Sequence, residues 1–588
     1  MIADNVGDNV GDVAGMGADL FESYVGSIIA AATLAITAAD ATVADEKMKL
    51  AFMLPALGIA CSTIGYFAVS TKAEGKGWDV ELGSLMWALE KGMYVAAAVF
   101  AGASYWLTCA YLALDITVWY CVITGLVAGA VIGAFGRRFP PFVAPLRAPA
   151  PRPPPTRSPR PPPPLPTPGK FTEYFTSFDF GPTISIKDRG ITGPATVVIQ
   201  GIGVGMISTV PSTLVLCTAI VATAALGGSY GVAISAVGML ATLGITLATD
   251  AYGPVADNAG GLAEMAGLDS KVRAITDSLD ALGNTTAATG KGFAIGSAVL
   301  TSLSLLSAFK DTINLPAHLY DVGEPVVLAG IIAGSMLPYL FAALTMISVG
   351  KAAAEIITEV RDQFANLKNE HGTTLGECIR MHTDMAEGKI QSVPKTKEVK
   401  PNSDRCVEIS TRSSVQEMIA PGTYAILAPL IGGFLVGPRF LLGMLAGAVG
   451  SGCMLAIMMA NAGGAWDNSK KLCEKLGLKK SSNPKEQQQQ KACVVGDTVG
   501  DPFKDTSGPA LNILLKLMSM VSLTVAPLLK PTDPENYVDF ATWQMGMIPL
   551  GVFILLTLVL IYLDILTWKD PLGDLIDGAK KKGGYAQL

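Results

Sequence analysis

Acidic residues recur at a regular interval near the start of the chain. Asp4, Asp8 and Asp12 are four residues apart, and Asp19 follows seven residues later. On a helix, these four side chains would lie along one face, where their like charges repel one another. The pattern therefore predicts that cations lie against this face.

The same spacing returns in the segment GDTVGDPFKDTSGPALNILLKLM, residues 496–518. Asp497, Asp501 and Asp505 are four residues apart, and Lys516 follows in the apolar run behind them. A single aspartate at a helix start is most often a cap or a partner of the helix dipole. Two glycine-rich stripes that each precede an apolar run favour a function instead, because charges at a membrane edge cost several kcal/mol unless they are paired or solvated.

Two further segments add charges of the same kind. Asp257 lies in DAYGPVADNAGGLAEMAG, and Asp467 and Lys470 lie in AWDNSKK. Many carboxylates and very few histidines are typical of a site for a hard cation, and Mg²⁺ binds oxygen ligands while it shares the phosphates of a substrate. Lys470 and Lys504 would then neutralise phosphate oxygens. The residues predict a small, highly charged phosphate substrate that carries several Mg²⁺ ions.

Other ligand classes fit the sequence less well. No GxxxxGK[ST] loop occurs, and GNTTAATGKG at 283–292 has the wrong glycine spacing for one, which disfavours a nucleotide. The net charge is -6 and no basic stripe interleaves with aromatic residues, so nucleic acid is not an expected partner. The nine cysteines are scattered singly, which disfavours a disulfide framework or a zinc site.

The elements that hold these residues are membrane helices. The chain has 588 residues, of which 50% are hydrophobic and only 16% charged, so it is too apolar for an ordinary soluble enzyme. About 20 apolar residues suffice to cross a bilayer, and the sequence predicts an all-α, polytopic transmembrane bundle of about eleven or twelve such helices. The runs lie near 17–40, 50–71, 92–113, 117–135, 193–225, 231–252, 292–310, 324–350, 419–437, 440–461, 508–529 and 546–567.

Glycine-rich segments indicate where helices pack closely, and a proline-rich segment indicates where the bundle is interrupted. The 63 glycines, and segments such as GMLAGAVGSG at 443–452, predict close contact between helices, and GIGVG at 201–205 is interpreted in the same way. Residues 134–169 are rich in Pro and Arg and are predicted to be a disordered insertion. Residues 360–418 and 466–500 read as polar loops. The basic tail predicts a cytoplasmic C-terminus.

These motifs resemble the membrane-embedded inorganic pyrophosphatases, which couple pyrophosphate hydrolysis to the pumping of H⁺ or Na⁺. The resemblance covers nearly the whole chain outside 134–169 and the region after about 530. It implies a single membrane domain over 1–588, with 546–567 an extra C-terminal helix. The motifs that carry it are IADNVGDNVGDVAGMGADL, DNAGGLAEMAG, GNTTAATGKG, GGAWDNSKK and GDTVGDPFKDTSGP.

The resemblance implies a Mg²⁺–pyrophosphate site. Within it, Asp12 together with Asp501 or Asp505 would position the attacking water, which is consistent with phosphoryl transfer by positioning and charge neutralisation. The implied metal ligands are Asp4, Asp8, Asp12, Asp257, Asp467, Asp497, Asp501 and Asp505, and the implied substrate-binding residues are Lys470, Lys504 and Asn284.

An ion gate is implied below that site. Asp19 and Glu22 share a helix face one turn deeper, and Lys516 would neutralise one of them and give way to a passing cation. The position of Glu22 favours Na⁺ over H⁺, and both ions remain candidates for the transported ion. Ala287 and Gly290 match the K⁺-dependent branch of the family, so activation by K⁺ is predicted.

The resemblance also carries expectations about the whole protein. Family members have about sixteen helices and are normally homodimers, and this chain begins inside the motif that precedes the sixth helix, so an N-terminally truncated member is expected. The catalytic face would be cytoplasmic. The membrane would be that of a vacuole or acidic organelle in a eukaryote, and the plasma membrane in a prokaryote.

Two alternatives stay open at this point. A cation-coupled secondary transporter would explain Asp19 and Glu22, but it would leave the two acidic stripes and the lysines unexplained. An inactive fragment would keep the fold and the ligands without hydrolysis.

Overall fold

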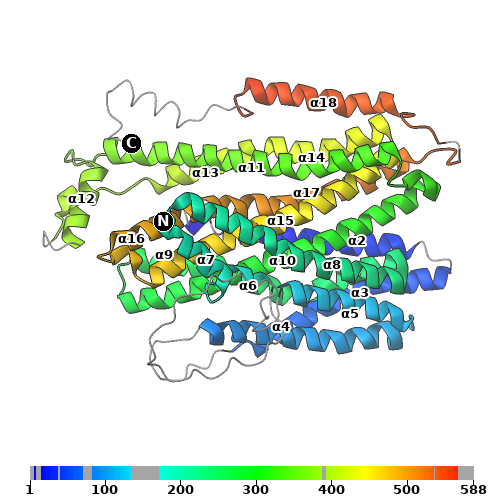
Figure 1. The fold of residues 1–588 in the computed structure, drawn as a ribbon, viewed down its shortest axis with the longest axis horizontal. Helices are drawn as coiled ribbons and strands as arrows, with labels where there is room; N and C mark the ends of the chain where they lie inside the picture. The colour runs from blue at the N-terminus through cyan, green and yellow to red at the C-terminus, as the bar shows by residue number, and fades with distance from the viewer. Residues whose placement is uncertain are drawn as a thin grey trace, which may run out of the picture.

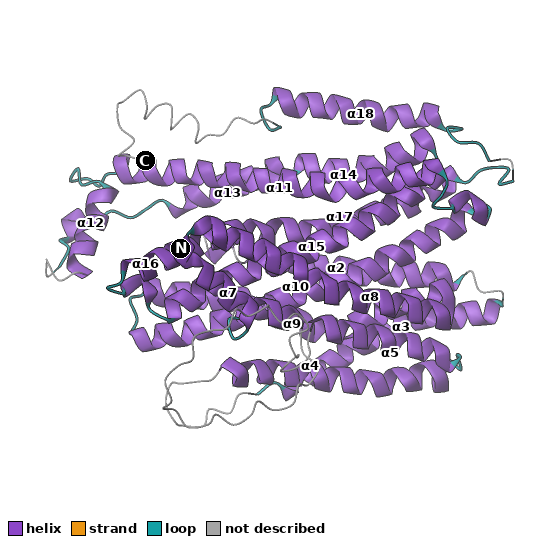
Figure 2. Ribbon diagram, in the orientation of Figure 1, coloured by secondary structure: helices purple, strands orange, loops and turns teal. Residues whose placement is uncertain are grey.

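The computed structural model describes residues 5–7, 9, 13, 15–36, 40–70, 82–133, 171–386, 392–535 and 537–566. Within these ranges the chain is predominantly helical, and its only β-type pairing is an isolated bridge between Lys368 and Thr374. The long helices run side by side along the longest axis (Figures 1 and 2). This arrangement confirms the predicted all-α bundle.

The described residues of the first half of the chain form mainly long helices. Three short helices, α6, α7 and η3, stand between α5 and α8. The bounds are α2 Gly15–Ala35, α3 Ala41–Ala68, α4 Leu82–Tyr105, η2 Trp106–Tyr111, α5 Ile116–Gly133, α6 Phe171–Thr176, α7 Gly181–Arg189, η3 Gly190–Thr192, α8 Pro194–Met239, η4 Leu240–Thr242 and α9 Leu243–Met265.

The second half contains the helices that carry most of the predicted site. The bounds are α10 Ser270–Ile313, η5 Ala317–Tyr320, α11 Pro325–Asn366, α12 Leu375–Ala386, η6 Lys395–Lys397, α13 Ser403–Glu417, α14 Ile419–Ile431, η7 Gly432–Val436, α15 Pro438–Lys475, η8 Leu478–Lys480, α16 Pro484–Asp501, η9 Pro502–Ser507, α17 Gly508–Leu529 and α18 Trp543–Tyr562.

The protein is an integral, multi-pass membrane protein. Ten of its helical segments are long and apolar enough to cross a bilayer within the described residues. One of them, Pro194–Met265, contains two of the predicted runs, and the shorter apolar helix Ile116–Ile132 accounts for another. The predicted run 546–567 falls on α18, while the predicted insertion 134–169 lies outside the described residues.

A pair of glycines divides the longest segment. Gly227 leaves the helical conformation, and Gly228 has φ 58° and ψ -148°, a backbone conformation that side chains rarely tolerate. The chain folds back there, because a Cβ on Gly231 would lie 2.4 Å from the carbonyl oxygen of Thr223, whereas eight residues of straight helix span about 12 Å. The break turns Pro194–Met265 into two membrane crossings.

Helices α11 and α15 pack backbone against backbone. A Cβ on Gly334 would lie 1.8 Å from the carbonyl oxygen of Met444, and one on Gly447 would lie 2.1 Å from that of Ile331. Such contact requires a small residue on at least one of the two helices, and small residues bring helices together where lipid removes the hydrophobic driving force. The close contact predicted from GMLAGAVGSG is confirmed, and it fixes α15, the helix that carries Asp467.

Candidate functional site

A buried tryptophan anchors the end of α15 that carries the predicted aspartate. Trp466 is fully buried; its Nε1 donates to the carbonyl oxygen of Val197 at 3.0 Å, and its ring packs edge-on against Phe503. A Cβ on Gly201 would lie 2.1 Å from Trp466 Nε1, so the GIGVG segment leaves room for the indole. The interpretation of GIGVG as helix packing is confirmed, and Asp467 is held rigidly beside this contact.

The second acidic stripe continues from α16 into a π-helical turn. Pro502 begins this turn, η9, which separates Asp497 and Asp501 on α16 from Lys504 and Asp505. A π-turn widens the helix locally and is frequent at functional sites. Lys504 is consequently buried, only 7% exposed, while the Asp501 side chain stays exposed.

Lysines and carboxylates from three helices meet at this place. Lys504 Nζ lies 2.8 Å from Asp467 Oδ2, and Lys470 Nζ lies 2.6 Å from Asp497 Oδ2. Weaker contacts join Lys504 to Asp501 at 3.6 Å and to Asp505 at 3.4 Å. The lysines offset part of the negative charge that burial would otherwise make very costly.

Three carboxylates of this cluster could share a metal ion. Ligand oxygens of Asp467, Asp497 and Asp501 all lie within 4.8 Å of one another. In the described part of the chain, no hydrogen-bond donor reaches Oδ1 of Asp467 or Oδ1 of Asp497, although both atoms are buried. Buried acceptors without a donor are costly, and a hard cation that prefers oxygen ligands would satisfy them. The donor set therefore fits Mg²⁺.

A second charged cluster lies deeper in the bundle. Lys516 is 1% exposed, and its Nζ donates to the carbonyl oxygen of Asp19 at 2.7 Å and to Ser23 Oγ at 3.1 Å. The same ammonium lies 3.3 Å from Asp19 Oδ1 and 3.2 Å from Glu22 Oε2. Twelve residues separate Lys516 from Lys504, about 18 Å at the helical rise, so the predicted gate residues meet well below the upper cluster.

Comparison with known proteins identifies the family of this chain. The family model described as inorganic H⁺ pyrophosphatase matches residues 1–141 and 167–525. The chain belongs to this family. The unmatched stretch 142–166 falls inside the Pro/Arg-rich segment, and α18 lies beyond the end of the match.

Individual relatives span both ion types. A relative from Bacteroides thetaiotaomicron is 43% identical over 575 residues, which cover 90% of this chain and 68% of the relative. A K⁺-insensitive pyrophosphate-energized proton pump from Methanosarcina mazei is 38% identical over 541 residues, 90% of this chain and 69% of the relative. A K⁺-stimulated pyrophosphate-energized sodium pump from Thermotoga maritima is 36% identical over 571 residues, 90% of this chain and 68% of the relative.

The remaining predicted residues differ in their surroundings, and some of them lie outside the described residues. Asp257 is exposed on α9, where the side-chain nitrogen of the next residue, Asn258, donates to the carbonyl oxygen of Asn5 at 3.1 Å. Gly290 lies against a buried carboxylate, because a Cβ there would be 2.5 Å from Asp250 Oδ1. Outside the described residues lie Asp4, Asp8 and Asp12 and the side chains of Asn284 and Ala287.

Two residues of these clusters were not predicted from the sequence. Asp280 of α10 accepts from Lys471 Nζ at 2.8 Å and so ties α10 to the upper cluster. Ser23 accepts from Lys516 in the lower one. Asp280 lies four residues before Asn284, and Ser23 four residues after Asp19. A search at helical spacing around the predicted residues would have found both.

Proposed function

We propose that this chain hydrolyses inorganic pyrophosphate to phosphate and couples the reaction to transport of Na⁺ or H⁺ across a membrane. The observation that carries the proposal is the pairing of two clusters, Asp467–Asp497–Asp501 with its lysines above and Asp19–Glu22–Lys516 below. A secondary transporter, which hydrolyses nothing, would not need the upper cluster.

The upper cluster has the parts that phosphoryl transfer needs. Asp467, Asp497 and Asp501 would hold Mg²⁺, which when bound neutralises phosphate oxygens and lowers the pKa of a coordinated water. Lys470 and Lys504 would face the phosphates as point charges. Asp501 or Asp505, with Asp12, would orient the attacking water. The further ligands in this proposal are Asp4, Asp8, Asp257 and Asn284.

The two clusters share a continuous helical path. Helix α17 leads directly from the π-turn to Lys516, and α11 contacts the turn through the hydroxyl pair Thr345 and Ser507, 2.8 Å apart. A movement of the π-turn when phosphate leaves would therefore displace Lys516 relative to Asp19 and Glu22. In this way α17, as a rigid helix, would transmit a movement from the site of hydrolysis to the gate.

Ion preferences follow from individual positions. The relative from Thermotoga maritima is K⁺-stimulated and transports sodium, and this chain has Ala287 and Gly290, so we assign it to the K⁺-dependent branch. The position of Glu22 favours Na⁺ as the transported ion, with H⁺ as the alternative.

The rest of the proposal concerns organisation. We infer a homodimer in the bilayer with the upper cluster on the cytoplasmic side. The membrane would be that of an acidic organelle in a eukaryote or the plasma membrane in a prokaryote. Residues 134–169 would be an insertion in the single membrane domain, and α18 an additional C-terminal span.

The proposal is tested with the purified full chain in proteoliposomes. Phosphate release from pyrophosphate should require Mg²⁺, rise with K⁺ and drive uptake of ²²Na⁺ or acidification. Asp467→Asn should remove release, while Asp404→Asn, an exposed aspartate on α13, should not. Pyrophosphate left intact by a correctly folded chain with Mg²⁺ and K⁺ present would refute the hydrolytic assignment.

A further inference from the structure

The lower end of α17, the helix that carries Lys516, rests on a second π-turn, η7. Leu529 is the last residue of α17 and is buried. It lies against η7, because a Cβ on Gly433 would be 2.9 Å from Leu529 Cδ1. Thirteen residues separate Lys516 from Leu529, about 20 Å at the helical rise. The lower end of the helix is therefore held far below the gate.

The chain returns to the same π-turn after the loop that follows α17. Phe540 donates its backbone N–H to the carbonyl oxygen of Val436 at 2.7 Å, and Thr542 Oγ1 donates to the carbonyl oxygen of Phe434 at 2.9 Å. The last carbonyl oxygens of a helix have no partner within it, and here the returning chain supplies the donors. Both ends of the loop are thus fixed to η7.

A buried ion pair fastens this loop to the start of α15. Arg439 Nε donates to Asp539 Oδ1 at 2.8 Å, and a second guanidinium nitrogen donates to Oδ2. The two side chains are only 14% and 15% exposed, and Glu324 Oε2 lies 3.5 Å from the same guanidinium group. A cation in the first turn of a helix is disfavoured by the helix dipole, so Arg439 is accounted for by its two-pronged pair with Asp539. We call this pair the lower anchor.

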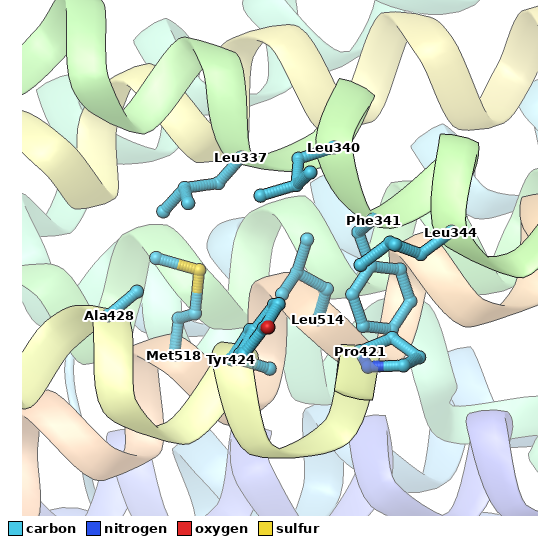
Figure 3. A pocket seen from close by; sticks show the side chains of 10 residues that line it. Leu337, Leu340, Phe341, Leu344, Pro421, Tyr424, Ala428, Leu514 and Met518 are labelled. Carbon is cyan, nitrogen blue, oxygen red and sulfur yellow. The ribbon is translucent and has the colours of Figure 1, made fainter. Parts of the chain in front are cut away.

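The middle of α17 is backed closely by two other helices. Figure 3 shows Met518 of α17 and Tyr424 of α14 on one side of this contact and Leu337 and Leu340 of α11 on the other. The space left between the three helices is about 10 Å³, enough for about one water molecule. Tyr424 is itself held by Thr557 of α18, with the two hydroxyl oxygens 2.8 Å apart.

This packing restricts how α17 can move. Met518 lies two residues after Lys516, which places it on the opposite face of the helix. A shift of the whole helix away from Asp19 and Glu22 would therefore press Met518 into α11 and α14. A tilt about the lower end is the movement that remains when the upper π-turn, η9, is displaced.

We propose that Arg439 and Asp539 are positioning residues for ion transport. Their pair fixes the lower end of α17, so that a displacement of η9 tilts the helix about this end. Lys516 then moves by about 60% of the displacement, in proportion to its place along the helix. Without the lower anchor, the lower end of α17 yields and Lys516 no longer follows η9. The inference rests on the proposed coupling of hydrolysis to transport.

Proteoliposomes that contain variants of the full chain test the proposal. In Arg439→Met and in Asp539→Asn, phosphate release should stay within about twofold of the unaltered chain. Ion uptake per phosphate released should fall by about tenfold, the effect of one hydrogen bond to a charged group. Arg405→Met is the matched control, because Arg405 is also paired with a carboxylate but is 46% exposed.

A double variant separates positioning from stability. Arg439→Met combined with Asp539→Leu leaves no charge buried alone, so the thermal stability lost in the single variants should return. Uptake per phosphate should stay low, because the attachment is still missing. Recovery of stability and uptake together would show that the pair serves only stability and would overturn the positioning role.

Hydrogen exchange followed by mass spectrometry tests the lower anchor without hydrolysis. Residues 519–529 should exchange faster in Asp539→Asn than in the unaltered chain or Arg405→Met, while exchange in α10 stays the same. If Arg439→Met does not fold, Asp539→Asn, which keeps the shape of the side chain, carries the test. Unchanged exchange and unchanged uptake per phosphate in a folded Asp539→Asn protein would overturn the proposal. Faster exchange in a chain that releases no phosphate would support the anchor and refute the hydrolytic assignment instead.

Discussion

Replacing Lys504 by methionine removes the cation that lies between three carboxylates of the upper cluster. Its Nζ is 2.8 Å from Asp467, 3.4 Å from Asp505 and 3.6 Å from Asp501. Methionine keeps most of the side-chain volume in the π-turn and deletes the charge. The substitution therefore isolates the electrostatic contribution of Lys504.

The structure sets the size of the expected effect. The Coulomb attraction between Lys504 and each carboxylate is about 5 kcal/mol at an effective dielectric constant of about 20. Most of this attraction is offset by the cost of burying the ammonium group. Removal of one partner from a buried ion pair costs about 3 to 5 kcal/mol. The lower end, about 3 kcal/mol, is expected, because Lys471 and Lys470 remain 3.6 Å and 3.9 Å from Asp467.

Urea unfolding in detergent, with and without Mg²⁺, measures this loss. The free energy of unfolding should fall by about 3 kcal/mol without metal, and Mg²⁺ should restore more stability to Lys504→Met than to the unaltered chain, because the ion replaces the missing positive charge. Phosphate release should fall about 100-fold, which corresponds to the same energy. Lys479→Met, at an exposed lysine, is the control. A Lys504→Met protein as stable as the unaltered chain, and no more responsive to Mg²⁺, would refute the reasoning.

Three further substitutions test the gate, the packing and the K⁺ position. Glu22→Gln removes a carboxylate 3.2 Å from Lys516 and should lower ion uptake per phosphate released by about tenfold, measured in proteoliposomes. Gly447→Leu places a Cβ 2.1 Å from the carbonyl oxygen of Ile331 and should destabilise the fold by at least 1 to 3 kcal/mol, roughly the cost of overpacking, seen as earlier thermal aggregation. Gly290→Ala places a Cβ 2.5 Å from Asp250 Oδ1 and should raise the K⁺ concentration needed for half-maximal stimulation.

The two glycine substitutions have controls in the same molecule. Gly350 and Gly450 lie on α11 and α15 with open space beside them, so Gly450→Leu and Gly350→Ala should leave stability and K⁺ response unchanged. Ion uptake per phosphate that is unaltered in Glu22→Gln would remove Glu22 from the transport path. An unchanged K⁺ response in Gly290→Ala would separate that position from activation.

Much of this protein follows from local sequence pattern. Apolar runs of membrane-spanning length can hardly fold otherwise in lipid, where every backbone polar group must be satisfied within its own helix. That constraint explains why, in the part of the chain that the structure describes, each of the twelve predicted runs falls largely on helix. The many carboxylates, with lysines among them, likewise predicted a hard cation and a phosphate ligand, because their residue types restrict the ligands they can share. That Asp467, Asp497, Asp501 and Lys504 belong to one site was implied by the family resemblance.

Contacts between distant segments were decided only by the tertiary structure. The spacing of four predicted a regular stripe over Asp497, Asp501 and Asp505, yet the π-turn after Asp501 lets Lys504 become buried against Asp467 of another helix. Lys516 meets Asp19 across almost the whole length of the chain, a contact that the family resemblance implied but that helical spacing alone does not. Periodicity tells which face of a helix is polar, but packing alone decides which face of another helix it meets.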